Sequence, residues 1–178
     1  DQTDAVAEVA RQMKVGDGLA PDTNMGPMAN PRRPAAIADL IKDAVGHGAR
    51  IRTGGEAIEG KGFFWQPTVL SDVPNSARIM NEEPFGPIVV ATPFATLDDA
   101  VEQANRLPYG LASFAFTENA RRANLIGDAI EAGMVGINTT ALAASDAPFG
   151  GVKESGHGSE DGPEGLAACL VTKTIHQH

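Results

Sequence analysis

Two adjacent carboxylates and one aromatic ring occur in a short stretch at residues 82–87, which read Glu-Glu-Pro-Phe-Gly-Pro. Each proline fixes its own φ and disfavours the α region for the residue before it, so the backbone is expected to be stiff and extended or turned. Residues two apart in an extended chain face the same side, which would direct Glu83 and Phe85 together. A carboxylate and a ring facing one way suit a ligand with vicinal hydroxyls and a flat ring, such as a nicotinamide riboside. The alternative is a charged turn whose Phe85 fills the core.

The hydrophobic pattern around this stretch predicts an α/β fold. The predicted helices cover residues 3–14 (with Thr3 as N-cap), 37–45, 97–104 (after a variant capping box of Thr96 and Asp99) and 119–131. The predicted strands cover residues 49–53, 63–70, 88–91, 111–116 and 134–138. Pro67 cannot donate to a ladder, so its strand lies at a sheet edge or breaks there. The apolar run at residues 88–91 is typical of a buried parallel strand. Alternating strands and helices from residue 88 to residue 138 therefore predict a parallel sheet covered on both faces, with ligands at the carboxyl ends of its strands.

A loop of small and polar residues, 139–146, follows the last of these strands. It leads into glycine-rich residues 147–158, where Phe149, like Phe85, lies between a proline and a glycine. Glycines there allow close approach of the backbone and positive φ. Further on, residues 170–176 alternate in polarity, as an edge strand or a pairing strand would.

The composition restricts the classes of function. A chain of 178 residues, 42% hydrophobic and 21% charged, is long enough for one domain with a substantial core, and no apolar run approaches the roughly 20 residues of a membrane helix. The formal charge of −9 argues against nucleic acid or an anionic membrane as a partner. A single cysteine, Cys169, excludes an internal disulfide and favours a reducing compartment, which we expect to be the cytoplasm. The four histidines have no metal-ligand spacing.

No complete catalytic constellation is present among the motifs. The chain has no G-x-S-x-G, which disfavours a Ser-His-Asp hydrolase of the elbow type. The Gly-His-Gly at residues 156–158 lacks the spacing and the preceding apolar strand of a dinucleotide fingerprint. Cys169 stands at the entry to an apolar segment, where a buried and inert thiol is expected rather than a nucleophile.

Four motifs, in order, resemble the NAD(P)-dependent aldehyde dehydrogenase superfamily. They are residues 82–87, Asn105 with Tyr109-Gly110-Leu111-Ala112, Gly-Met-Val-Gly-Ile-Asn at residues 133–138, and Pro-Phe-Gly-Gly-Val-Lys-Glu-Ser-Gly at residues 148–156, with Gly54-Gly55 and Gln66-Pro67-Thr68-Val69 upstream. The resemblance covers essentially the whole chain and matches the C-terminal third or so of such an enzyme. It implies part of a three-layer αβα catalytic domain over residues 1–168 and an oligomerisation strand over residues 169–178. The nucleophilic cysteine and the glutamate base of the family are expected upstream of Asp1.

The resemblance implies oxidation of an aldehyde to the carboxylic acid with NAD or NADP as cofactor. A thiolate attacks the aldehyde, hydride passes to the nicotinamide, and water cleaves the thioester. Glu83 then accepts hydrogen bonds from the nicotinamide-ribose hydroxyls, and Phe85 packs beside that ribose. Residues 139–146 correspond to a loop of the substrate tunnel and Phe149 to its aromatic wall. Residues 170–176 correspond to a strand that crosses to a neighbouring subunit in a homo-oligomer, a dimer or tetramer.

The substrate implied is a small-molecule aldehyde, and the motifs are closest to the succinate-semialdehyde branch. Two departures limit that implication. Ser159 replaces the arginine of the usual Gly-x-Gly-Arg-Glu, and the hydroxyl that would bind the substrate carboxylate falls on Ala143, which leaves Ser145, two residues along, as the substrate candidate. Without a nucleophile and base the 178 residues alone are expected to be inactive. The alternative is a non-catalytic aldehyde-dehydrogenase-like module for interaction or assembly.

Overall fold

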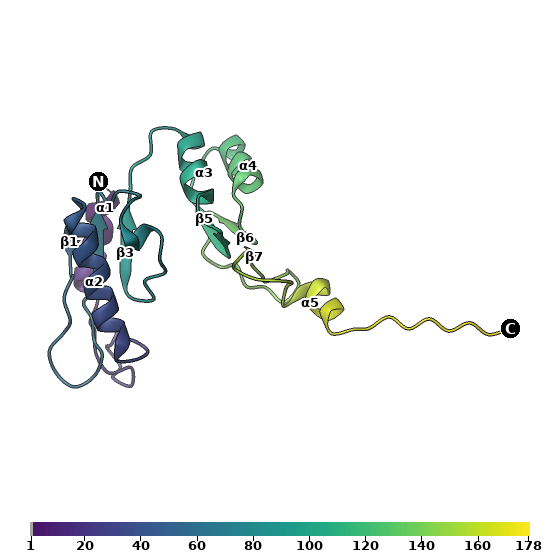
Figure 1. Ribbon diagram of the computed structural model, residues 1–178, viewed down its shortest axis with the longest axis horizontal. Helices are drawn as coiled ribbons and strands as arrows, with labels where there is room; N and C mark the ends of the chain where they lie inside the picture. Colours follow the sequence, from purple (N-terminus) through teal and green to yellow (C-terminus); the bar gives the residue numbers. More distant parts are fainter. Residues whose placement is uncertain (1) are drawn as a thin grey trace. The chain divides into compact units, whose positions relative to one another are not determined.

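The chain forms two compact units in a computed structural model that describes residues 2–178. The first unit ends at Pro93 and the second begins at Phe94 (Figure 1). Both units combine helices with strands, which confirms the α/β class. The division at Pro93 falls inside the alternating run that the sequence analysis treated as one sheet.

The first unit is built on a three-stranded mixed sheet. Its elements are α1 (Gln2–Gln12), α2 (Arg32–Gly46), β1 (Arg50–Thr53), β2 (Thr68–Ser71), the 3-10 turn η1 (Arg78–Met80) and β3 (Ile88–Ala91). The strand order is β1-β2-β3, with β2 antiparallel to β1 and parallel to β3. The central strand, β2, is buried along its whole length.

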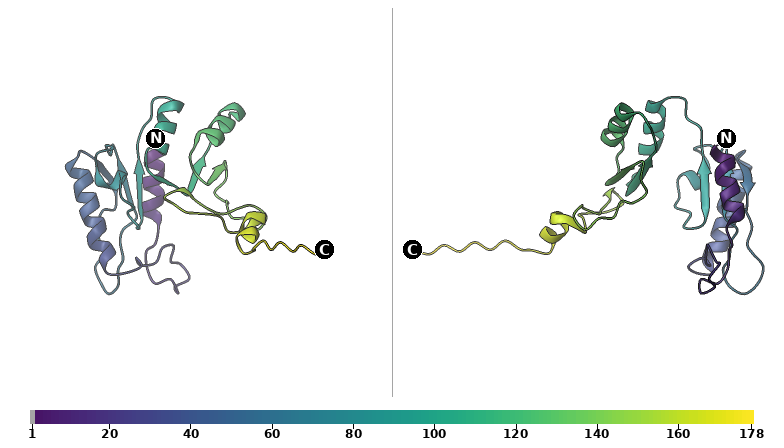
Figure 2. Two further views of the ribbon diagram at one scale, coloured as in Figure 1. Left: turned by 45° about the vertical axis from the view of Figure 1, so that its right-hand side comes forward. Right: turned by 180° about the vertical axis from the view of Figure 1, so that it is seen from behind.

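Helices cover both faces of this sheet. Successive side chains of β2 point to opposite sides, so the strand contributes apolar side chains to each face. Leu70 packs into the larger core beneath α2, together with Ile37 and Leu40. Its neighbour Val69 packs on the other side, against Ala7 and Ala10 of α1. The left view of Figure 2 shows the sheet between α2 (blue) and α1 (purple). The first unit is thus three layers: helix, sheet, helix.

Thr68, the first residue of β2, satisfies three polar groups at the sheet end. Its Oγ1 accepts from the Gly55 amide at 2.9 Å and from the Trp65 indole nitrogen at 3.2 Å, and it donates to the Gln66 carbonyl at 2.8 Å. Only 1% of Thr68 is exposed, so water cannot replace these bonds. Gly54 packs alongside, since a Cβ there would lie 2.3 Å from the carbonyl oxygen of Pro67.

Replacing Thr68 by the isosteric valine is expected to lower the free energy of unfolding by about 1–3 kcal/mol, because buried donors lose their acceptor while the volume stays nearly constant. Denaturant unfolding measures the loss. Thr172→Val is the matched control, since Thr172 lies exposed in the C-terminal segment. Equal stability of Thr68→Val and Thr172→Val would show that the three hydrogen bonds contribute nothing net.

Two predicted features of the first unit need correction, and a third is confirmed. Thr3 lies inside α1, which begins at Gln2, so it is not the N-cap. Of the two alternatives for residues 63–70, the break at Pro67 is confirmed, because β2 starts only at Thr68 and is the central strand of its sheet. β3 is parallel, as predicted, but it is the edge strand of this sheet and its Val89 is 48% exposed. Only Ile88 and Val90 pack against the core beneath α2.

The second unit contains one β–α–β crossover and one short antiparallel pair of strands that lie far apart in the sequence. Its elements are α3 (Leu97–Asn105), β4 (Tyr109–Gly110), β5 (Ala112–Ala115), α4 (Ala120–Ala129), β6 (Met134–Ile137), β7 (Val152–Lys153) and α5 (Gly162–Ala168). β5 and β6 are parallel, in register from Ala112 opposite Met134 to Ala115 opposite Ile137. β4 and β7 are antiparallel.

The single sheet predicted from residue 88 to residue 138 is therefore wrong in its connectivity. β3 pairs with β2 in the first unit, whereas β5 pairs with β6 in the second. Helix starts in the second unit agree with the sequence pattern, because Thr96 Oγ1 accepts from the Asp99 amide at 3.1 Å and Asn119 Oδ1 accepts from the Arg122 amide at 2.9 Å.

The C-terminal segment after α5 is exposed from end to end. Residues 170–176, predicted to form a pairing strand, form no strand with any part of the chain that the structure describes. Val171 is 94% exposed and Ile175 is 76% exposed. Figure 1 shows the segment running out as an extended tail in yellow.

Candidate functional site

Residues 82–87 are anchored at both ends by backbone hydrogen bonds. The Glu82 amide donates to the Arg78 carbonyl of η1 at 2.8 Å, and the Pro87 carbonyl accepts from the Thr68 amide of β2 at 2.8 Å. In between, Gly86 lies directly on the core: a Cβ at this position would come within 1.9 Å of Ile37 Cδ1. The stretch is held against α2 by this contact, which no residue larger than glycine could make without a shift.

The two adjacent glutamates have different environments. Glu82 forms a bidentate ion pair with Arg78, with Oε1 2.7 Å from Nε and Oε2 3.0 Å from Nη2. Glu83 is exposed, and among residues 2–178 no side chain or amide pairs with its carboxylate. The sequence analysis chose Glu83 as the ligand-binding carboxylate, and of the two glutamates the structure leaves Glu83 with both oxygens available to a ligand.

The Glu82–Arg78 pair makes stability depend on pH. Hydrogen bonding by Arg78 holds the pKa of the Glu82 carboxyl below its usual value of 4.5. A lowered folded-state pKa contributes stability that is present above the unfolded-state value and is lost as pH falls through the folded-state value. The stability difference between the wild type and Glu82→Gln is therefore expected to be small near neutral pH, since both groups are exposed, and to disappear as pH falls through the lowered folded-state pKa of Glu82. Thermal melting at a series of pH values measures it, and a difference that grows with acidification would contradict the pairing.

Phe85 does not fill the core. Its ring is 69% exposed, which excludes the alternative of a turn plugging the interior. Its φ of +43° is left-handed, so the extended alternation expected to align Phe85 with Glu83 does not hold through residue 85. Arg33, in the first turn of α2, contacts Phe85 and the residue before it: its guanidinium carbon lies 5.7 Å from the Phe85 ring centroid, and Nη2 donates to the Pro84 carbonyl.

Ser145 and Phe149 lie in one loop of the second unit. The loop is joined to the segment ahead of α5: Phe149 exchanges backbone hydrogen bonds of 2.8 and 2.7 Å with Glu160, and the Ser145 carbonyl accepts from the Gly162 amide at 3.2 Å. Ser145 is exposed and its hydroxyl is available, whereas Phe149 is half-buried. The two substrate candidates, Ser145 and Phe149, thus share one loop of the second unit. The two cofactor candidates, Glu83 and Phe85, lie in the first unit.

Several motif residues have structural roles that the sequence analysis did not assign. Lys153 Nζ donates to the Asn105 carbonyl at 3.0 Å and the Leu107 carbonyl at 3.1 Å, where α3 ends, and it pairs with Glu131. Ser155 Oγ accepts from the Gly110 amide at 2.9 Å. These contacts fix the loop that carries Phe149, so much of the motif at residues 148–156 is scaffold.

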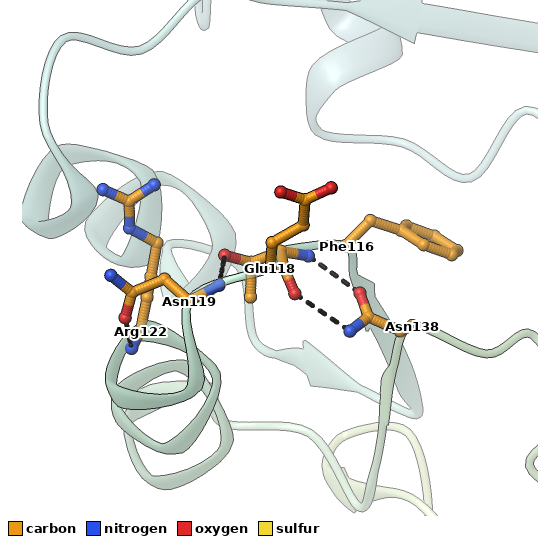
Figure 3. Close-up of a pocket in the computed structure, with 6 residues that line it drawn as sticks. Phe116, Glu118, Asn119, Arg122 and Asn138 are labelled. Carbon is orange, nitrogen blue, oxygen red and sulfur yellow. Dashed lines mark hydrogen bonds between the residues drawn. The ribbon is translucent and has the colours of Figure 1, made fainter.

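An open hollow of about 600 Å³ lies at the carboxyl ends of β5 and β6, where parallel strands place ligand sites. It is lined by Phe116, Thr117, Glu118, Asn119, Arg122 and Asn138. Figure 3 shows Phe116 and Arg122 pointing to opposite sides, while the Asn138 amide is turned onto the backbone. Both Asn138 bonds go to Thr117, at 2.8 and 2.9 Å, so this amide is engaged by the scaffold. None of the predicted site residues lines this hollow.

Cys169 is exposed at the C-terminus of α5, which corrects the expectation of a buried thiol. It is exposed because the segment that follows packs on nothing within the described chain. The described residues contain no cluster of three or more His, Cys, Asp or Glu that could hold a metal ion. No helix within residues 2–178 is long and apolar enough to cross a membrane.

A sequence model described as "Aldehyde dehydrogenase family" matches residues 1–175. The chain belongs to the aldehyde dehydrogenase family. This confirms the resemblance carried by the four motifs.

Named relatives agree with the assignment. The chain is 46% identical over 176 residues to a putative 4-(hydroxymethyl)benzenesulfonate dehydrogenase, TsaD2, of Comamonas testosteroni, covering 99% of this chain and 36% of the relative. It is 42% identical to a succinate-semialdehyde dehydrogenase of Paenarthrobacter nicotinovorans, covering 92% and 36%. A betaine aldehyde dehydrogenase of Staphylococcus aureus, solved in complex with NAD+, superposes with a TM-score of 0.88 at 36% identity, covering 95% of this chain and 34% of that one. This chain therefore spans about a third of the length of these aldehyde dehydrogenases.

Proposed function

We propose that this chain is the C-terminal part of an NAD(P)-dependent aldehyde dehydrogenase and supplies the side of the cofactor site that binds the nicotinamide riboside. The observation that carries the proposal is the contrast between Glu82, which Arg78 occupies, and Glu83, whose exposed carboxylate pairs with nothing among residues 2–178. Relatives bind this class of cofactor, as the NAD+ complex from Staphylococcus aureus and the NADP+-named enzymes indicate.

Glu83 and Phe85 fit a riboside in different ways. Each oxygen of the Glu83 carboxylate can accept a hydrogen bond from one of two vicinal hydroxyls, and a charge-assisted bond contributes roughly 1.5–3 kcal/mol. Phe85 offers an exposed ring for packing beside the sugar. When bound, the nicotinamide accepts a hydride from the substrate. The role of this chain is to orient the ring that accepts it, and a thiol nucleophile and a base are supplied by the rest of a longer polypeptide.

The substrate that we propose is a small aldehyde carrying an anionic group, succinate semialdehyde or a related semialdehyde. Two relatives support an anionic group, since one is named for succinate semialdehyde and another for a benzenesulfonate. The exposed Ser145 hydroxyl could donate to a carboxylate or sulfonate, and Phe149 could form an apolar wall behind it. The benzenesulfonate relative, at 46% identity over 99% of the chain, makes an aryl aldehyde with a sulfonate the second candidate.

The test is a dehydrogenase assay on the full-length protein that contains this sequence, with NAD+ and NADP+ each supplied in turn. Succinate semialdehyde, sulfonated benzaldehyde and an uncharged aldehyde of similar size are compared by kcat/KM. We expect formation of the reduced cofactor, and a preference for one of the anionic aldehydes. No reduction of either cofactor with any aldehyde would support the alternative, a non-catalytic module for interaction or assembly.

The intact mass of the source protein separates the same two alternatives without an assay. An enzyme requires a polypeptide about three times the 18.5 kDa of this chain, because the chain covers 36% of its relative. A mass of 18.5 kDa would favour the module.

In either case we propose that residues 170–176, exposed along their length, pair with another subunit, because an unpaired extended segment has free backbone donors and acceptors. The single cysteine supports the cytoplasm as the compartment.

A further inference from the structure

We propose that Arg33 is a positioning residue for the cofactor site, and that it acts by holding the exposed ring of Phe85 in place. Arg33 lies in the first turn of α2, more than fifty positions from Phe85 in the sequence, and no motif includes it. The inference rests on the proposed function of Glu83 and Phe85, and it adds to that function a residue outside the stretch at residues 82–87.

Two contacts carry the inference, one on each side of the Pro84–Phe85 peptide bond. The Nη2 of Arg33 donates to the Pro84 carbonyl, immediately before Phe85. Its guanidinium carbon lies 5.7 Å from the centroid of the Phe85 ring, within the range of a cation–π interaction. One side chain therefore fixes both the backbone that leads into residue 85 and the ring itself.

The backbone of Phe85 needs such a restraint. A φ of +43° is unfavourable for a residue with a Cβ, and such a conformation persists only where surrounding contacts enforce it. Phe85 receives little help from packing, because its ring is 69% exposed. Gly86 restrains the chain on one side through its contact with Ile37, and Arg33 is the side chain that restrains it on the other.

The contacts described for the Arg33 guanidinium are those with Pro84 and Phe85. Among the residues that the structure describes, no carboxylate forms an ion pair with Arg33. Its Nε is buried and has no hydrogen-bond partner. Burying a donor without a partner is unfavourable, so the contacts of the guanidinium end with the Pro84 carbonyl and the Phe85 ring must hold the side chain in this orientation. With the guanidinium carbon 5.7 Å from the centroid, Phe85 is still 69% exposed, so most of its ring is free to pack against a ligand.

The experiment measures cofactor affinity in the full-length protein by calorimetric titration with NAD+ and NADP+. Arg33→Met, which keeps the length of the side chain but not its charge or donors, is expected to weaken binding about five-fold. Arg32→Met is the matched control, because Arg32 is the exposed neighbour and its side chain contacts neither Pro84 nor Phe85. It is expected to bind like the wild type.

A double-mutant cycle shows whether Arg33 acts through Phe85. Arg33→Met is combined with Phe85→Leu, and the double variant is expected to bind no more weakly than Phe85→Leu alone. Losses that add, or an Arg33→Met variant that binds like Arg32→Met, would overturn the inference. If Arg33→Met does not fold, Arg33→Lys replaces it in the same cycle, because lysine keeps a cation but lacks the planar guanidinium that faces the ring. A smaller loss relative to the wild type is then expected, and a loss that simply adds to that of Phe85→Leu would equally overturn the inference.

The same titration separates the inference from the proposed function. If Glu83→Gln weakens binding while the Arg33 variants do not, the cofactor site stands and the positioning role is wrong. If Glu83→Gln binds both cofactors as tightly as the wild type, the assignment of the site itself is wrong.

Discussion

Glu83→Gln in the full-length protein is expected to weaken use of the nicotinamide cofactor about ten-fold or more. The substitution keeps the shape of the side chain but removes its charge and replaces one acceptor oxygen by a donor. Two ribose hydroxyls can both donate to a carboxylate, whereas an amide accepts through one oxygen only. Loss of about 1.4 kcal/mol corresponds to each ten-fold change in rate or affinity. Steady-state kinetics with varied cofactor, together with direct binding, measure the loss.

Glu82 provides an unusually close control for this experiment. Glu82→Gln makes the same chemical change one residue away, but its carboxylate is paired with Arg78 on the exposed side of η1. We expect Glu82→Gln to leave kcat and KM near the wild-type values. Equal losses from the two substitutions would indicate a general effect of charge in this stretch. Unchanged kinetics for Glu83→Gln would support the alternative that residues 82–87 form a surface turn without a role in cofactor binding.

Gly133→Ala is expected to destabilise the second unit by about 2–3 kcal/mol. A Cβ at residue 133 would lie 1.9 Å from the Gly150 carbonyl oxygen and 3.2 Å from Gly151 Cα, both backbone atoms that cannot rotate away. The chain must therefore move where β6 begins or where the Phe149 loop passes over it. The apparent melting temperature of the full-length protein measures the loss, and cofactor kinetics should change less than stability does.

Gly127→Ala is the matched control for this second substitution. Gly127 lies within α4, and a Cβ there would meet no atom within 4 Å. Alanine favours helix over glycine by up to about 1 kcal/mol, so this variant is expected to be slightly more stable than the wild type. Destabilisation of similar size in both variants would contradict the close contact between Gly133 and Gly150.

The sequence predicted the elements and the motifs well because those depend on local pattern. Helix starts at Thr96 and Asn119 follow from capping chemistry, and the break at Pro67 follows from its missing amide hydrogen. Which strands pair is a different matter, since it depends on contacts far apart in the chain. Nothing in the local pattern of β3 indicated that it pairs with β2 and not with β5.

The candidate site shows the same limit at the level of single residues. The sequence favoured Glu83 over Glu82 through its spacing from Phe85 and through the family resemblance, but only the structure shows that Arg78, one turn earlier, engages the Glu82 carboxylate. The left-handed φ of Phe85 arises from tertiary restraint, so no propensity could indicate it. Arg33 was unrecognised for the same reason, because its contact with residues 84–85 spans half of the first unit's sequence.

The central claim is that Glu83 binds the nicotinamide ribose, and a crystal structure of the full-length protein with NAD+ or NADP+ tests it most directly. We expect both hydroxyls of that ribose within about 3 Å of the Glu83 carboxylate oxygens, the usual distance for such hydrogen bonds, with the Phe85 ring packed beside the sugar. A bound cofactor whose nicotinamide ribose is held by other groups, with Glu83 left in solvent, would contradict the account.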